Sequence, residues 1–144
     1  MAASGTQLRP RSLTVADAEA LAALSQKLGG SETVAQWVAF FERPHAIAVG
    51  TIADGHIVGY AAGEVRTGFG LPRPVAWVEA FGIDLDHRGA GLGRTILGEL
   101  LRRAAALGAA HVYTLVPVHD RVLAPFFRQL GFRDEPLSCL GCSL

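Results

Sequence analysis

Apolar positions along the chain recur with two different periods, which divide the sequence into predicted helices and strands. Spacings of three and four residues predict amphipathic helices, whereas short alternating or continuous apolar runs predict strands. Glycine and proline clusters mark the turns between them. The predicted elements are a strand at residues 8–13, helices at 15–28 and 32–42, strands at 46–53, 56–65 and 75–85, a helix at 92–107, a strand at 111–117 and a helix at 122–130.

Local signals support several of these boundaries. Thr14 followed by Asp17 has the spacing of a capping box at the start of the first helix. Asp54 followed by Gly55 is a strong two-residue hairpin signal between two predicted strands. The glycines and prolines of residues 66–74 predict a loop, which we expect to face the substrate.

The composition agrees with one globular domain over residues 1–144. Half of the 144 residues are hydrophobic and 18% are charged, which is enough apolar surface for a core. Thirteen basic residues balance thirteen acidic ones, so we expect no nucleic-acid and no membrane partner. The chain start lacks the features of a signal peptide and only two cysteines occur, so we expect a cytoplasmic protein.

The strongest chemical signal is a glycine-rich turn between a predicted strand and a long predicted helix. Gly89, Gly91 and Gly93 leave backbone amides accessible at a helix N-terminus, where the helix dipole favours a phosphate or pyrophosphate. Arg88 and Arg94 flank the turn and can add charge-assisted hydrogen bonds. A plain strand–helix connection rarely needs three alternating glycines, so the turn indicates a phosphorylated ligand.

The spacing of the turn excludes two common phosphate-binding motifs. The sequence contains no nucleotide P-loop of the form GxxxxGK[ST]. The dinucleotide motif GxGxxG fails because its third glycine would fall at Arg94, whereas the glycine comes at Gly93. The remaining pattern, Arg88-x-x-Gly91-x-Gly93, resembles the pyrophosphate-binding motif of the GNAT superfamily of acetyltransferases.

The resemblance covers roughly residues 8–132. Leu8-Arg9-Pro10 looks like the opening strand of the family, the segment 81–88 like its fourth strand running into the turn, and the segment 120–132 like its late helix. The resemblance implies a three-layer α+β fold. It also implies a mixed, mostly antiparallel sheet of six to seven strands, about four flanking helices and a V-shaped splay between strands four and five.

The resemblance further implies acetyl-CoA as cosubstrate and no metal ion. In the family, the pantetheine arm pairs with the backbone of the fourth strand, and amides of the glycine turn hold the pyrophosphate. Carried over by position, the cofactor-binding residues are Phe81, Gly82, Ile83, Arg88, Gly89, Ala90, Gly91, Leu92, Gly93 and Arg94.

Glu79 is the candidate catalytic base, because it is the single acid inside an apolar strand where related enzymes often carry one. It could instead anchor the substrate amine, face solvent or pair with an arginine such as Arg66. The position where the family commonly has a tyrosine acting as general acid is Phe127. A water molecule, Tyr113 or His119 are the alternatives for that proton.

The implied reaction is transfer of an acetyl group to a primary amine of a small molecule or a protein, by direct attack in a ternary complex. Two alternatives stay open: a catalytically silent CoA-binding regulatory module, and an enzyme that uses a longer acyl-CoA. Asp120, where the family often has asparagine, is also interpreted as the cap of the late helix. The apolar segment 137–144 could form a last strand or pack against a second copy, which would make a homodimer.

Overall fold

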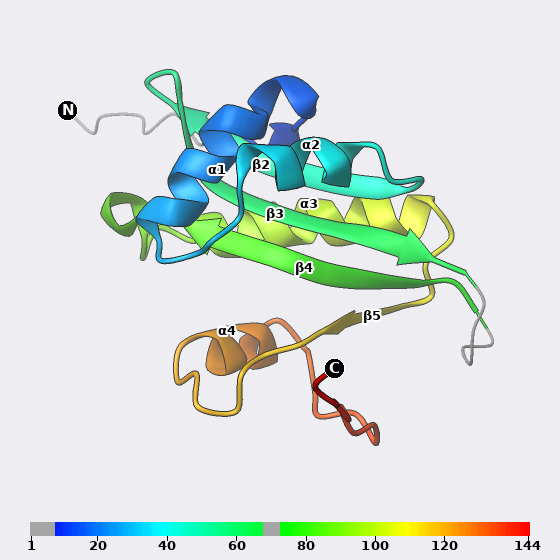
Figure 1. The fold of residues 1–144 in the computed structure, drawn as a ribbon. Helices are drawn as coiled ribbons and strands as arrows, with labels where there is room; N and C mark the ends of the chain where they lie inside the picture. The colour runs from blue at the N-terminus through cyan, green and yellow to red at the C-terminus, as the bar shows by residue number, and fades with distance from the viewer. Residues whose placement is uncertain (1–7, 68–72) are drawn as a thin grey trace.

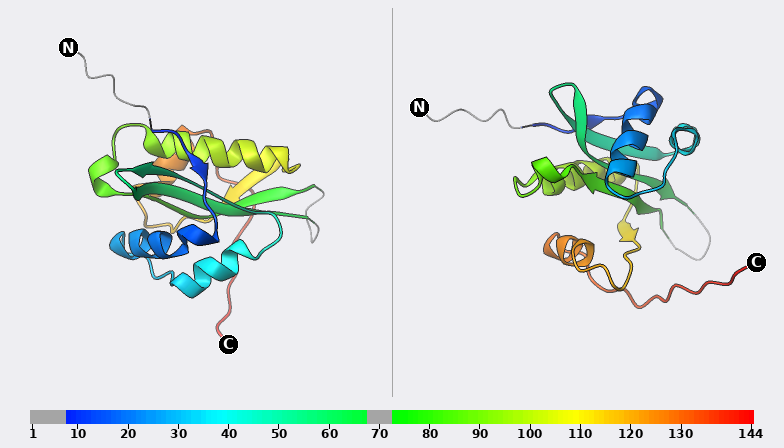
Figure 2. Two further views of the ribbon diagram at one scale, coloured as in Figure 1. Left: turned by 90° about the horizontal axis from the view of Figure 1, so that it is seen from above. Right: turned by 60° about the vertical axis from the view of Figure 1, so that its left-hand side comes forward.

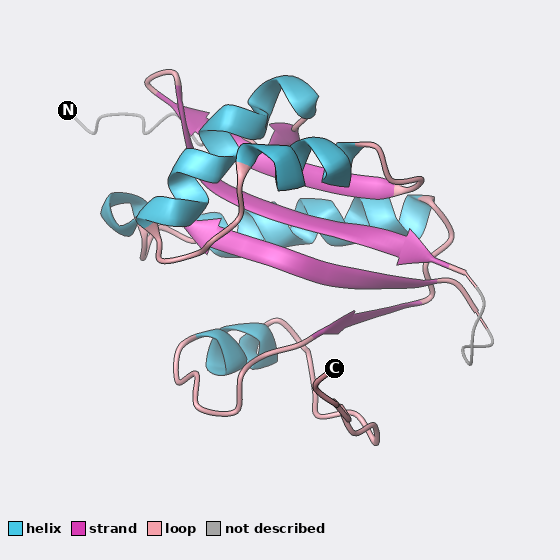
Figure 3. Ribbon diagram, in the orientation of Figure 1, coloured by secondary structure: helices cyan, strands magenta, loops and turns pink. Residues whose placement is uncertain are grey.

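The computed structural model describes residues 8–67 and 73–144 and shows an α+β fold (Figures 1 and 3). The middle of the predicted substrate loop, residues 68–72, lies outside the described residues. The elements in chain order are β1 (Arg11–Ser12), the 3-10 turn η1 (Val15–Asp17), α1 (Ala18–Lys27), α2 (Val34–Phe41), β2 (Ala46–Ala53), β3 (His56–Arg66), β4 (Val75–Ile83), the 3-10 turn η2 (Leu85–His87), α3 (Leu92–Ala106), β5 (His111–Thr114) and α4 (Leu123–Gln129).

The strands form one sheet in the order β1-β2-β3-β4-β5. The first four strands pair antiparallel, and β5 runs parallel to β4. Seen along the sheet, α1 and α2 cover one face and α3 covers the other (Figure 2, left). The two faces carry separate apolar clusters, centred on Leu21 and on Ile96, both of which are fully buried.

The expectation of six to seven strands is wrong for the described residues, which form five. The opening strand is only two residues long, and residues 132–144 form no strand. β5 ends at Thr114 rather than at Pro117. β4 diverges from β5 at this point, so the residues after Thr114 have no neighbouring strand with which to form hydrogen bonds.

The central hairpin confirms the sequence-based prediction. β2 has the predicted bounds, and β3 is one residue longer than expected. Asp54 and Gly55 take φ angles of 51° and 77°, the left-handed values of a turn whose twist matches the flanking strands.

Capping side chains set where the first two helices begin. The carboxylate of Asp17 accepts the N–H of Thr14 at 2.8 Å, as predicted, although the first turn is 3-10 rather than α-helical. The second helix begins at Val34, two residues later than predicted. Thr33 caps it by accepting the N–H of Gln36 at 3.2 Å, while the Gln36 side chain accepts the N–H of Thr33 at 2.8 Å.

A β-bulge at Glu79 determines the shape of the sheet edge. Ala62 pairs with Ala80 and Gly63 with Val78, so Glu79 is the extra residue on β4. A Cβ atom on Gly63 would overlap the carbonyl oxygen of Trp77, which explains the glycine opposite the bulge. β5 pairs with β4 only up to Val78, and the edge of β4 over residues 79–83 is therefore free of a partner strand.

Candidate functional site

The divergence of β4 and β5 leaves a cleft of about 510 Å³. One wall is the free edge of β4, and the opposite side is formed by residues that follow β5 and by α4. The end of α1 and the loop after it close the cleft on the face of the sheet that α1 and α2 cover. Phe81 marks the end of the cleft that lies next to the glycine turn.

The glycine turn presents free amides at the start of α3. Gly89 and Gly91 have φ angles of 85° and 77°, a left-handed conformation that side chains rarely adopt. The first helical bond of α3 runs from the N–H of Thr95 to the carbonyl of Gly91 at 3.2 Å. Within the described part of the chain, the N–H groups of residues 89–94 donate to no protein acceptor. The turn therefore keeps several donors available for an anion.

Gly93 is a glycine for a different reason, which is packing. A Cβ atom at this position would lie 3.0 Å from Cζ of Phe81 and 3.2 Å from Cε2 of Phe126. The rings of Phe81 and Phe126 stack with their centroids 4.9 Å apart. The side chain of Phe81 thus links β4, the start of α3 and α4, and brings the glycine turn next to the cleft.

The other predicted cofactor residues lie around this corner. A Cβ atom on Gly82 would come within 2.8 Å of Leu28 and 3.0 Å of Tyr60, so glycine lets the end of α1 approach β4 closely. Arg88 turns back onto the strand end, where its Nε donates to the carbonyl oxygen of Ile83 at 3.1 Å. Arg94 is exposed in the first turn of α3.

Glu79 lies in a network of four charged side chains at the bulge. Its two carboxylate oxygens lie 2.9 Å from Nη1 of Arg43 and 3.1 Å from Nη2 of Arg66. Both arginines also approach Glu64 at 3.5 Å. The Glu79 side chain is 32% exposed and also lines the cleft. The pairing with Arg66 is one of the alternatives that the sequence left open, and proton transfer to Glu79 would require one of these ion pairs to loosen.

Neither Tyr113 nor His119, the two side chains considered as substitutes for the missing tyrosine, lines the cleft. Phe127 lines it but is only 4% exposed, with its ring in contact with other aromatic side chains of the core. Tyr113 packs against Trp77 with ring centroids 5.1 Å apart and lies outside the cleft lining. His119 is exposed and also lies outside the lining.

Asp120 caps α4, as one reading of the sequence predicted. One carboxylate oxygen accepts the N–H groups of Leu123 and Val122, each at 2.8 Å. These two hydrogen bonds lower the pKa of Asp120 below its ordinary value.

Sequence reasoning missed a polar group on the α1 side of the cleft: Ser25, Glu32 and Tyr60. The Ser25 hydroxyl donates to the Glu32 carboxylate. Burial raises the pKa of Tyr60 above its ordinary value; a hydrogen bond with Ser25 opposes this shift, and the charge of Glu32 adds to it. The three residues come from separate elements of the fold. The sequence signal for this group was Gly30, a second glycine after α1 that the end of the helix does not by itself require.

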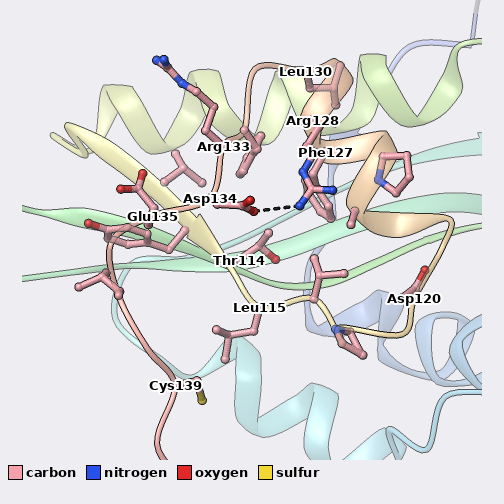
Figure 4. Close-up of a pocket in the computed structure, with 18 of the residues that line it drawn as sticks. Thr114, Leu115, Asp120, Phe127, Arg128, Leu130, Arg133, Asp134, Glu135 and Cys139 are labelled. Carbon is pink, nitrogen blue, oxygen red and sulfur yellow. Dashed lines mark hydrogen bonds and ion pairs between the residues drawn. The ribbon is translucent and has the colours of Figure 1, made fainter.

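A second and larger hollow, of about 1,030 Å³, lies between β5, α4 and the C-terminal segment (Figure 4). The pair of Arg128 and Asp134, 2.9 Å apart, crosses it. Neither the glycine turn nor the free edge of β4 contributes to its lining. The smaller cleft is therefore the better candidate site, because it adjoins the free amides.

Neither a metal centre nor a membrane helix is found in residues 8–67 and 73–144. No three His, Cys, Asp or Glu side chains gather there as potential metal ligands, and both Cys139 and Cys142 are exposed free thiols. No helix in these ranges is long and apolar enough to cross a bilayer.

Comparisons with known sequences agree with the geometry. The profile of the Acetyltransferase (GNAT) family matches residues 16–132. A curated relative, "Probable N-acetyltransferase 14" of Danio rerio, is 35% identical over 81 residues. That match covers 56% of this chain, and the chain spans only 28% of the relative's length.

Solved structures with the same fold include several N-acetyltransferases. Aminoglycoside N-acetyltransferase AAC(6')-Iy in complex with CoA superimposes with a TM-score of 0.84 at 15% identity, over 99% of both chains. The ribosomal-protein-alanine N-acetyltransferase of Brucella melitensis biovar Abortus 2308 gives a TM-score of 0.79 at 17% identity, over 95% of this chain and 99% of that one. At these identities the likeness concerns the fold alone.

Proposed function

The chain belongs to the acetyltransferase (GNAT) family, and from this premise we propose that it moves the acetyl group of acetyl-CoA to a primary amine in a ternary complex. The observation that carries the proposal is the adjacency of two features. The free amides of residues 89–94 lie beside Phe81, where the unpaired edge of β4 begins to line the cleft. An anion and an extended polar chain can therefore be bound side by side.

Each of these features fits one part of the coenzyme. The amides at the start of α3 suit its pyrophosphate, and the free edge at Phe81, Gly82 and Ile83 suits the pantetheine arm, which can pair with backbone like an added strand. The bound coenzyme supplies an activated acetyl thioester. We expect backbone N–H groups near Ile83 to polarise the carbonyl oxygen of this thioester.

The acceptor amine must lose its proton before it attacks. For an alkylamine with a pKa of about 10.4 this costs about 4 kcal/mol near neutral pH, whereas an α-amine with a pKa of about 8 needs about 1 kcal/mol. Glu79 stays our candidate for the base or for the amine anchor, with Arg43 and Arg66 controlling its availability. A thiolate with a pKa of about 8.5 is a fair leaving group, so the absence of a tyrosine at Phe127 is compatible with turnover.

The anion site is tested by comparing Gly91→Leu with Gly108→Leu. Both glycines have left-handed φ angles, 77° and 94°, and open space around a Cβ atom, so both variants carry a similar backbone penalty. Gly108 follows the far end of α3. We expect Gly91→Leu to weaken acetyl-CoA binding at least about tenfold in calorimetry, because its side chain would project over the free amides. Equal binding by the two variants would contradict the proposal.

A silent CoA-binding module is the second candidate. The two ion pairs of Glu79 and the burial of Phe127 in the aromatic core favour it, because they leave no obvious acid or base. Release of free thiol from acetyl-CoA across a panel of amines separates the candidates: binding without turnover on any acceptor supports the module. Competition between acyl-CoA chain lengths in the same assay tests the longer-acyl alternative.

A further inference from the structure

The cleft has a second polar wall, on the face of the sheet that α1 covers. It is built from Ser25 on α1, Glu32 in the α1–α2 loop and Tyr60 on β3. Ser25 and Tyr60 are 2% and 4% exposed, and Tyr60 also packs edge-on against Trp37 with ring centroids 5.6 Å apart. Because these side chains are held by core packing, the wall has a fixed geometry.

Glu32 is fixed over Gly30. Its carboxylate accepts the hydroxyl proton of Ser25, and its backbone carbonyl accepts a hydrogen bond from Gln26 at 3.2 Å. A Cβ atom on Gly30 would lie 2.5 Å from Oε2 of Glu32 and 2.5 Å from Oγ of Ser25. Glycine at this position therefore makes room for the carboxylate to fold back onto Ser25.

The charged side chains that line the cleft all have the same sign. Among the residues that the structure describes, its lining contains two carboxylates, Glu32 and Glu79, and no Lys, Arg or His side chain. Glu79 is neutralised by its two arginines, whereas Glu32 has no ion-pair partner among the described residues. In a chain with zero net charge, this leaves one uncompensated negative charge at the α1 side of the cleft.

We infer that the acceptor carries a second cationic group, which binds Glu32 while the reacting amine lies near the free edge of β4. Tyr60 lines the same wall, and its hydroxyl is a further polar contact for this group. The inference rests on the proposed acetyl transfer for the reacting end of the acceptor. It defines the substrate class as diamines and larger polycationic amines.

Two acceptors of equal chain length test the inference: cadaverine, with an amine at each end, and aminopentanol, with a hydroxyl in place of one amine. We expect thiol release from acetyl-CoA to show a KM for cadaverine about tenfold lower than for aminopentanol. In Glu32→Gln the ratio of the two KM values falls to near one. Glu19→Gln, an exposed acid in the first turn of α1, is the matched control and keeps the wild-type ratio.

Tyr60→Phe keeps the ring packing and removes only the hydroxyl, so it separates the contribution of the Tyr60 hydroxyl from that of the Glu32 carboxylate. It should raise the KM for cadaverine less than Glu32→Gln does, while melting temperature and acetyl-CoA affinity stay at wild-type values in both variants. Equal KM values for the two acceptors in the wild type, or a preference that survives in Glu32→Gln, overturn the inference and leave the transfer reaction standing.

If acetyl-CoA binds but neither amine causes release of free thiol from it, the proposed reaction fails on these acceptors. The binding of cadaverine then decides the inference. Calorimetry with cadaverine is then carried out on CoA-saturated wild type, Glu32→Gln and Glu19→Gln. Loss of affinity only in Glu32→Gln supports the cation site, and equal affinities in all three overturn it.

Discussion

At the scale of single residues, several glycines in the site exist because a neighbour leaves no room for a Cβ atom. Gly63 faces the carbonyl of Trp77 across the bulge, and Gly93 faces two aromatic rings. The sequence predicted a function for Gly93, but not the contact with Phe81 and Phe126 that makes it a glycine. Such contacts join residues far apart in the chain, so the local sequence pattern does not predict them.

Gly63→Ala should destabilise the fold and change the bulge. The added methyl group overlaps backbone rather than a flexible side chain, so we expect a loss of about 2 kcal/mol or more in the free energy of unfolding. Gly98→Ala, at an exposed position in α3 with open space around it, is the control and should stabilise by about 0.5–1 kcal/mol. Urea unfolding of both variants provides the measurement, and a neutral Gly63→Ala would refute the steric explanation.

At the scale of elements, prediction succeeded where the signal is local. The hairpin of β2 and β3, the capping at Asp17 and the capping at Asp120 were all read from neighbouring residues. The bulge at Glu79 and the early end of β5 were missed, because they depend on pairing between strands that lie tens of residues apart. The position of Glu79 was therefore known, but its partners Arg43 and Arg66 were not both foreseen.

Helix α3 carries a charge cluster with a testable pH dependence. Hydrogen bonds from Arg102, and then from Arg103, lower the pKa of Glu99 from 4.5 to about 2. Because the folded-state pKa lies below the ordinary value, the stabilisation is complete above about pH 4.5 and disappears as the pH falls toward 2. It should not exceed about 1 kcal/mol, since Arg102 is exposed and the side chains of Glu99 and Arg103 remain partly accessible to solvent.

Unfolding of wild type and Glu99→Gln across this range checks the expectation. The difference in stability between the two should be largest near neutral pH and should shrink toward zero near pH 2. A difference that stays constant over the whole range would show that the arginines do not lower the pKa of this carboxyl.

At the scale of the whole molecule, the C-terminal segment contributes little to the core. Residues 133–144 are all exposed, and the segment runs away from the body of the protein (Figure 2, right). The pairs of Arg128 with Asp134 and of His111 with Glu135, 2.7 Å apart in the second case, hold only its first part. The sequence left two alternatives for this segment, a last strand of the sheet or a contact with a second copy. The described residues form no such strand, and the contact stays a prediction.

Removal of residues 136–144 should leave the free energy of unfolding within about 0.5 kcal/mol of the full chain. A shorter form that also lacks residues 132–135 is the comparison, because it loses Phe132, whose ring lies 5.0 Å from that of Phe127. This second form should melt at a clearly lower temperature. Similar destabilisation of both forms would mean that the exposed segment has a structural role.

The free edge of β4 gives the protein a built-in reporter of occupancy. Among residues 79–83, the amides that point into the cleft have no strand to bond with, so their protons exchange with deuterium from the solvent readily. A ligand that pairs with this edge would slow that exchange locally, while the β2–β3 hairpin stayed unchanged. Mass spectrometry of a single peptide could then distinguish empty from loaded molecules in a mixture without any added label.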